Sequence, residues 1–521
     1  MAGALVACPL AEAGHEVVLF EAGSRVNRAR AVERFRSSVD RGLDSPYPTS
    51  SLAPAPRVDD WESHLRQEGP ELFMGVYQRL VGGTTWHWLG TALRLLPEDF
   101  RMSSEFGLGV DWPISYDDLE PWYCLAEREL GVSGDSSREL GSPRSQEYPM
   151  PAVKTALVDR FFKEAIPGGS ELFVDLPQAR NSVPYAGRPR CCGSASCIPI
   201  CPIGAKYDAS VHVEKALRAG ATLRANTLVT RLEKGLSGKV ERLQFLTADG
   251  KTGADSGDLV VVAAHAVESA CLLLRSGLSN SSGQVGRNLM GASAQLSWGL
   301  SPRAVYPYRA PQATSGCMKS RGGDSRRERA GFLTTISTDG WPQYGPEQVA
   351  STLIRRGLRG KELKEAVADH VSRQVALVST CEQLPNPANR VLPTKKWLDS
   401  AGLPRPAVRF EEGAYSRRGV EESRRFHQTL LGALKADQVT HSLAADPAYS
   451  LGTTRMGQEP MTSVVDKNLR SHDHSNLYLV GSHVFPTSGT APPTLTVAAL
   501  ALRLAHQLTS LEPSSRPVSS W

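Results

Sequence analysis

The 521-residue sequence has no long hydrophobic run, no basic leader and little excess charge. Nothing approaches the roughly eighteen consecutive apolar residues of a membrane helix, so no transmembrane segment is expected. The opening residues MAGALVACPLAEAG contain no basic n-region, which argues against a signal peptide. The net charge is only +5, without a long basic run, so nucleic acid is not an expected partner. The length allows two or three structural units.

Paired C-x-x-C spacings, which structural zinc sites prefer, are also missing from the densest cysteine segment. This run, CCGSASCIPICP at 191–202, holds four of the nine cysteines: Cys191, Cys192, Cys197 and Cys201. Such density indicates an iron–sulfur site, because thiolates are the usual ligands of these clusters. Zinc and disulfides remain alternatives, although the adjacent Cys191 and Cys192 make two ordinary bridges awkward. The other five cysteines are scattered and are expected to be small buried hydrophobes.

The first 22 residues have the pattern of the later part of a dinucleotide-binding βαβ unit. An Ala-rich helix at 2–13 is followed by Gly14 and an apolar strand at 15–20. Glu21 ends that strand, where such folds place an acid that accepts hydrogen bonds from a ribose. Of the G-x-G-x-x-G fingerprint only the third glycine, Gly3, is present, so we expect the first two glycines and the first strand to precede Met1. An ordinary helix and strand is the alternative.

Further motifs carry a family resemblance over almost the whole chain. They are LFEAG (19–23), VGGTTWHWLGTA (81–92), DWPISYDDLEPWY (111–123), the cysteine run with CPIGAKY, VGRNLM (285–290), LPNPANRVLP (384–393), GTTRMG (452–457) and the C-terminal block from VVDKNLR to LTVAALALRLA. In this order they resemble the glucose–methanol–choline (GMC) oxidoreductases. Within that family the resemblance is to the catalytic subunit of bacterial FAD-dependent glucose dehydrogenase and to the large subunits of gluconate and fructose dehydrogenases.

The resemblance implies an α/β fold in which a Rossmann-like FAD-binding domain, truncated at its N-terminus, is interleaved with an α+β substrate domain built on an antiparallel sheet. We assign 1–105, 200–290 and 440–521 to the FAD-binding domain, and 106–199 and 291–439 to the substrate domain. The residue pattern agrees in part, since it predicts strands at 222–232, 258–263 and 477–480 and helices over 268–274 and from Pro493 onward.

The resemblance also implies the residues that contact FAD. These are Gly3, Glu21, Gly82, Gly83, Thr84, Trp86, His87, Leu228, Gly481, Ser482, Thr494 and Leu495. The two adjacent glycines allow the backbone to turn close to a ligand, and the aromatic residues beside them supply planar surfaces. In some relatives a histidine in this stretch is covalently attached to the flavin, and His87 matches its position. The alternative is an aromatic loop packed beside the ring.

In the similar dehydrogenases the cysteine run holds a [3Fe-4S] cluster that passes single electrons to a partner. Cys191, Cys197 and Cys201 are the preferred ligands, and Cys192 is a spare. The implied partners are a cytochrome c electron-acceptor subunit and a small chaperone-like subunit. The implied location is the bacterial periplasm, or the periplasmic face of the inner membrane through the partner subunits, with the cytoplasm as the alternative. A cluster favours a dehydrogenase over an oxidase, which would have no need of it.

The family's catalytic pair is replaced in this chain. The proton-abstracting His would lie three residues before the glycine of GTTRMG, where Tyr449 stands, and its Asn partner corresponds to Pro492. A tyrosine with a pKa of about 10 is a poor base at neutral pH, and proline has no side-chain donor. His483 is the nearest substitute, or else a structural histidine, and His441 and His265 are weaker candidates.

Three hypotheses therefore stand at the level of sequence. The chain is an FAD-dependent dehydrogenase acting on CH–OH groups of sugars, alcohols or sugar acids with a shifted acid–base residue. Alternatively, it is a catalytically degenerate homologue that serves in interaction or electron transfer. It is also expected to be a truncated gene product with impaired FAD binding, which is compatible with either. No signature in 291–440 identifies the substrate.

Overall fold

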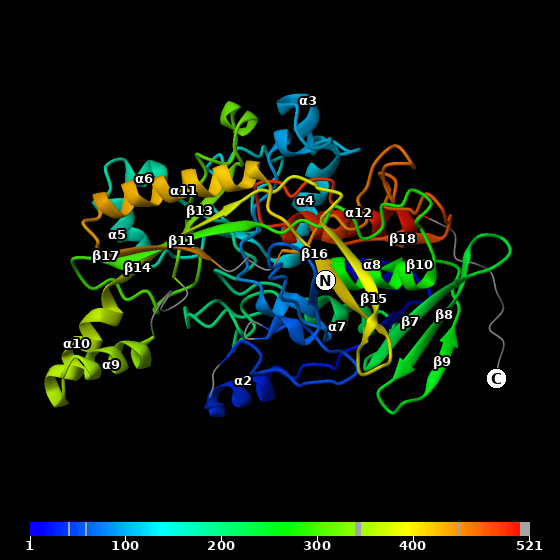
Figure 1. The fold of residues 1–521 in the computed structure, drawn as a ribbon, viewed down its shortest axis with the longest axis horizontal. Coiled ribbons are helices and arrows are strands. Elements are labelled where there is room, and N and C mark those ends of the chain that lie inside the picture. Colours follow the sequence, from blue (N-terminus) through cyan, green and yellow to red (C-terminus); the bar gives the residue numbers. More distant parts are fainter. Residues whose placement is uncertain (40–41, 58–59, 339–344, 445–448, 511–521) are drawn as a thin grey trace.

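The computed structural model describes residues 1–39, 42–57, 60–338, 345–444 and 449–510 (Figure 1). Two short parallel strand pairs join distant parts of the sequence. Strand β1 (Val18–Phe20) pairs with β6 (Thr222–Arg224), and β10 (Val260–Val262) pairs with β18 (Leu477–Leu479). Parallel pairs of this kind need long crossover connections, which here carry the helices and the other parts of the molecule.

Helices α1 (Ala2–Glu12) and α12 (Thr494–Thr509) lie side by side in the main core. Both are apolar over most of their surface, and such helices are stable only when they are buried. Leu5 of α1 and Leu495 of α12 have no exposed surface. The flanking helices α4 (Tyr116–Leu130) and α7 (Ser210–Arg218) pack against this pair, and Ser115 caps α4 by accepting a hydrogen bond from the Asp118 N–H.

The strand predicted at 222–232 is two strands. Asn226 adopts a left-handed conformation (φ +53°), which asparagine tolerates better than most residues and which turns the chain out of the parallel pair. The chain then continues as β7 (Thr227–Lys234), in a three-stranded antiparallel sheet with β8 (Val240–Thr247) and β9 (Thr252–Asp255). The predicted helix at 268–274 is the middle of α8 (Ala266–Ser276).

A six-stranded antiparallel sheet forms the other half of the molecule, in the order β17-β11-β14-β13-β12-β5. Its strands are β17 (Asp437–Ala444), β11 (Ser293–Leu300), β14 (Gln374–Cys381), β13 (Phe332–Ile336), β12 (Ser315–Cys317) and β5 (Val174–Asp175). Helix α11 (Ala414–Ala433) lies along the sheet (Figure 1). His427 of this helix contacts the sheet: its two ring nitrogens lie 2.9 and 2.8 Å from the hydroxyls of Ser297 in β11 and Ser379 in β14.

This sheet confirms the predicted antiparallel substrate half. The exact domain boundaries stay a prediction. Strand β17 spans the boundary predicted between residues 439 and 440. The remaining elements are α2 (Arg28–Ser37), α3 (Met102–Phe106), α5 (Leu157–Ala165), α6 (Gly169–Leu172), α9 (Pro346–Arg355), α10 (Gly360–Arg373), β2 (Arg66–Gln67), β3 (Ser133–Gly134), β4 (Met150–Pro151), β15 (Arg390–Leu398) and β16 (Pro404–Arg409). Within the described ranges, no helix has the length and apolarity needed to cross a bilayer.

Candidate cofactor site

A cavity of about 2100 Å³ lies between the two parallel strand pairs and reaches the antiparallel sheet. Its wall includes the start of α1, the end of β1, the loop at 82–89, the segment 260–265 and the start of α12. Pockets for small ligands usually measure about 300–1,000 Å³, so this one has room for an extended dinucleotide together with a small substrate.

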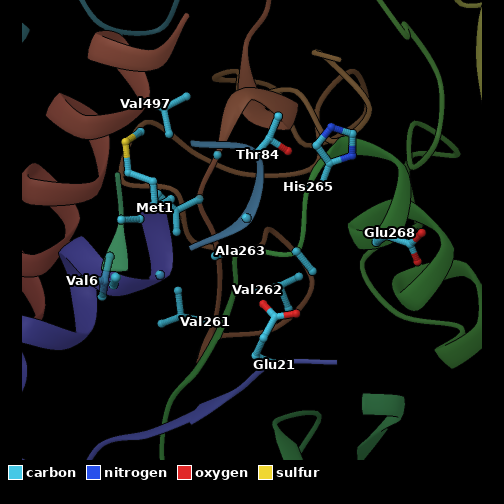
Figure 2. Close-up of a pocket in the computed structure, with 18 of the residues that line it drawn as sticks. Met1, Val6, Glu21, Thr84, Val261, Val262, Ala263, His265, Glu268 and Val497 are labelled. Carbon is cyan, nitrogen blue, oxygen red and sulfur yellow. The ribbon is translucent and has the colours of Figure 1, made fainter. Parts of the chain in front are cut away.

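The end of β1 supplies an acid to the cavity. Glu21 lies below Val261, Val262 and Ala263 in Figure 2 and accepts a hydrogen bond of 2.9 Å from the Gly23 N–H. Burial raises the pKa of Glu21, while the Gly23 N–H and the Arg79 guanidinium oppose that rise. Gly3 lines the same region, and a Cβ there would lie 3.3 Å from that of Ala263. Both predicted contacts of the dinucleotide half therefore face the cavity.

The loop at 82–88 forms a second wall. Gly82 and Gly83 have φ values of +100° and +56°, and the 3-10 turn Gly83–His87 follows them. Thr84 lines the cavity, whereas Trp86 is 2% exposed and points beneath the loop, where its Nε1 donates to the Val81 carbonyl at 3.0 Å. Trp88 is the tryptophan that faces the cavity. Trp86 was predicted to contact the cofactor, but it is not on the cavity wall. Trp88 takes that place.

His87 lines the cavity as a neutral imidazole. Burial is the main cause that lowers its pKa to about 4. Its Nε2 is buried and has no hydrogen-bond partner among the described residues. An unpaired buried polar atom costs free energy unless a ligand satisfies it, so this nitrogen is a candidate contact for the cofactor.

The C-terminal block closes the cavity. Gly481, Ser482 and Thr494 line it, as does Leu228 from β7. Leu495 is fully buried in the main core and is not on the wall. Thr494 is the first residue of α12, whose N-terminal amides carry partial positive charge that favours an electron-rich group.

Two of the predicted catalytic positions are on the wall and one is behind it. Tyr449 and Pro492 line the cavity. His483 is fully buried and does not line it; its Nδ1 lies 2.6 Å from Thr454 Oγ1, and burial is the main cause that lowers its pKa to about 3.

The two weaker candidates lie apart from each other. His441 is in the antiparallel sheet, where its Nδ1 lies 2.7 Å from Ser297 Oγ. His265 lines the cavity on the same side as Thr84 (Figure 2), and its ring stacks on Tyr77 with centroids 4.1 Å apart. Burial lowers the pKa of His265 to about 4.

Glu268 and its partners form an ionic group on the cavity wall that was not predicted from the sequence. Glu268 of α8 receives the Tyr77 hydroxyl at 2.6 Å, lies 2.8 Å from His64 Nε2 and pairs with Arg79 at 3.8 Å. Burial works against the charged form of Glu268, but Arg79 and His64 hold its pKa well below the usual range. The available signal was an acid within the apolar sequence AVESACLLL, which calls for a buried partner.

The cysteine run comes together beside the loop at 82–88. Cys197 and Cys201 are buried, Cys191 is half-buried, and Cys192 is exposed. Burial is the main cause that raises the pKa of Cys191; the Gly193 N–H and Arg180 oppose that rise, and the thiols of Cys197 and Cys201 add to it. Backbone N–H groups donate to two of the sulfurs, from Gly193 to Cys191 at 3.4 Å and from Lys206 to Cys201 at 3.5 Å.

The iron–sulfur assignment of the cysteine run stays a prediction. All nine cysteines are free, so the disulfide interpretation finds no support. In the described part of the chain, no group of three or more His, Cys, Asp or Glu side chains is arranged to hold a metal ion. N–H donors to sulfur and a buried setting are among the features that tune clusters.

Two family models match the chain, both described as GMC oxidoreductase, over residues 161–292 and 385–501. The fructose dehydrogenase large subunit of Gluconobacter japonicus is 34% identical, over 97% of this chain and 95% of the relative. The 2-methyl-1,2-propanediol dehydrogenase of Mycolicibacterium austroafricanum is 27% identical (96% and 92%), and the gluconate 2-dehydrogenase flavoprotein of Pantoea cypripedii is 23% identical (96% and 90%).

Solved structures share the fold at low sequence identity. Pyridoxine 4-oxidase from "Mesorbium loti" superposes with a TM-score of 0.64 and 18% identity, over 98% of each chain. An Aspergillus oryzae formate oxidase variant gives 0.63 and 13% identity, over 98% of this chain and 96% of the other. These similarities confirm the predicted fold class.

Proposed function

The chain belongs to the GMC oxidoreductase family, and from that premise we propose that it is an FAD-dependent dehydrogenase acting on a CH–OH group of a sugar, alcohol or sugar acid. FAD would supply the acceptor for the hydride that leaves the carbinol carbon as CH–OH becomes C=O. The two electrons would then leave singly through an iron–sulfur cluster to an external one-electron acceptor.

One observation supports this proposal above the others. A single cavity is bounded by Gly3, Glu21, the loop at 82–88 and the start of α12, and the cysteine run packs against that loop through Ile200 and Trp86. Glu21 would bind the ribose, His87 Nε2 would hydrogen-bond to the flavin, and the loop would keep water from the ring. Covalent attachment through His87 remains a hypothesis, which flavin retained on acid-precipitated protein would establish.

The test is the visible spectrum of the purified protein, loaded with FAD and kept free of oxygen. We expect flavin absorbance that bleaches on addition of fructose, gluconate or a related polyol. Bleaching by dithionite but by none of a panel of sugars, sugar acids and simple alcohols would contradict the dehydrogenase proposal.

The cluster is tested separately. We propose Cys191, Cys197 and Cys201 as ligands of a [3Fe-4S] cluster, with the exposed Cys192 as a spare. Anaerobically purified protein should contain iron and sulfide, Cys197→Ser should lose both, and Cys192→Ser should retain them. Zinc alone, or no metal, in the unaltered protein would refute this part and leave the flavin proposal standing.

The implied partners follow from the same proposal. Two relatives are named as a large subunit and a flavoprotein of dehydrogenases, which supports a multi-subunit complex. We propose a cytochrome c acceptor subunit and a small chaperone-like subunit as its other members, and a location in or facing the bacterial periplasm. Reduction of added cytochrome c in a donor-dependent, cluster-dependent manner is the measurement that checks it.

One observation favours a second candidate, a catalytically degenerate homologue. Tyr449 and Pro492, which the family resemblance aligns with the acid–base pair, line the cavity, while His483 is fully buried and does not line it. A protein that binds FAD and the cluster but shows no flavin reduction by any donor would support this candidate.

A further inference from the structure

Lys206 connects the cysteine run to the loop on the cavity wall. Its side chain is 2% exposed. The Nζ donates to the carbonyls of Thr85 and Trp86, at 2.9 and 3.2 Å, which are the two residues before His87. The backbone N–H of the same residue donates to Cys201 Sγ. One residue thus contacts both the candidate flavin loop and a candidate cluster ligand.

The charges around Lys206 are unusual for a buried lysine. The two hydrogen-bond acceptors of its Nζ are neutral carbonyls. Asp208, whose charge favours the protonated form of Lys206, is paired with Arg28, which also donates to the Cys201 carbonyl at 2.9 Å. Burial is the main cause that lowers the pKa of Lys206 to about 8; Arg180 adds to that fall, while Asp208 and the thiols of Cys197 and Cys201 oppose it. Buried charges are costly unless they are compensated, so this cation belongs beside a group that carries negative charge.

An iron–sulfur cluster on three thiolates is such a group. It is anionic when oxidised and gains one further negative charge on accepting an electron. A fixed positive charge nearby stabilises the reduced form more than the oxidised form, and net charge is one of the factors that set cluster potentials.

We propose that Lys206 is a positioning residue that couples the two redox sites. Its ammonium raises the reduction potential of the cluster, so that electrons pass from flavin to cluster, and its hydrogen bonds fix the loop against the cysteine run. Asp208 moderates the effect by offsetting part of the positive charge. The inference rests on the proposed function, because it requires the cluster.

The experiment measures the midpoint potential of the cluster by anaerobic spectroelectrochemistry in the full chain, with iron content and thermal melting recorded for each variant. Lys206→Gln keeps N–H donors for the two carbonyls but removes the charge. We expect its midpoint to become more negative, by about tenfold in the one-electron equilibrium constant, or about 59 mV. Lys206→Arg should stay near the unaltered value. The control is Lys361→Met, which removes an exposed lysine on α10.

A second variant keeps the test decisive if Lys206→Gln does not fold. Asp208→Asn removes the moderating negative charge, so its midpoint should move in the positive direction. An unchanged midpoint in a folded Lys206→Gln protein, or in Asp208→Asn, would overturn the inference while the cluster and the proposed function stand. Absence of iron from the unaltered protein is a different result, because it refutes the cluster and the inference together.

Discussion

Replacing His483 with glutamine should reveal whether this histidine is a neutral structural group or a working base. Its pKa is about 3 in the folded protein and about 6.5 in the unfolded chain. A histidine with a depressed folded pKa contributes full stability above the unfolded value and loses it as the pH falls toward the folded value. Between pH 8 and pH 5 the unfolded chain gains nearly one proton at this site, which removes about 2 kcal/mol.

The assay is urea unfolding of the unaltered protein and of His483→Gln at several pH values from 8 to 5. Glutamine retains a polar contact for Thr454, so packing losses give a difference that is independent of pH. In addition, the difference in free energy of unfolding between the unaltered protein and His483→Gln should be about 2 kcal/mol smaller at pH 5 than at pH 8. His506→Gln, at an exposed position of α12, controls for the substitution itself. A difference that stays constant over this range would mean that His483 titrates normally in the fold, as an accessible base would.

Three further variants test the site. Gly82→Ala should lower the free energy of unfolding by about 1–3 kcal/mol in a denaturant titration, because φ is +100° and the new Cβ would lie 2.6 Å from the Trp86 Nε1; an unchanged midpoint would contradict this loop geometry. Glu21→Gln should weaken FAD binding about tenfold or more in fluorescence titration, since hydrogen bonds to a charged group contribute about 1.5–3 kcal/mol; equal affinity would remove Glu21 from the ribose. Tyr449→His with Pro492→Asn should accelerate anaerobic flavin reduction by up to about 10²–10⁴-fold, and no gain in a folded, flavin-loaded variant would show that the acid–base function lies elsewhere.

Sequence patterns predicted the parts of the site that depend on backbone position. Glu21 faces the cavity because it ends a strand that follows a buried helix, and the paired glycines of the loop adopt the left-handed conformations expected of them. The antiparallel half was implied by the family resemblance rather than by residue pattern. The pattern did predict a C-terminal helix from Pro493 onward, but as an amphipathic one, whereas α12 is buried over most of its length.

Side-chain direction within the loop was beyond the sequence. Nothing in GGTTWHW indicates that Trp86 turns inward and Trp88 toward the cavity, because the left-handed glycines break any period that would relate neighbouring side chains. The Glu268 network was missed for another reason. Its partners Tyr77 and Arg79 are nearly two hundred residues away in the sequence, as the separation of 191 between Tyr77 and Glu268 shows, and only the fold brings them together.

The backbone at Tyr449 and Pro492, the two positions that the family resemblance assigns to the acid–base pair, is held by neighbouring residues. Gly452 has φ of +86°, and a Cβ there would lie 2.2 Å from the Asn288 carbonyl, so the chain just after Tyr449 is held against 288–290 by a contact that only glycine permits. Pro492 is placed by α12, whose Thr496 hydroxyl lies 2.8 Å from the Tyr123 hydroxyl. Neither anchor involves the side chain at the catalytic position. Tyr449 also packs against the main core, so the Tyr449→His, Pro492→Asn variant tests catalysis once its thermal melting matches that of the unaltered protein.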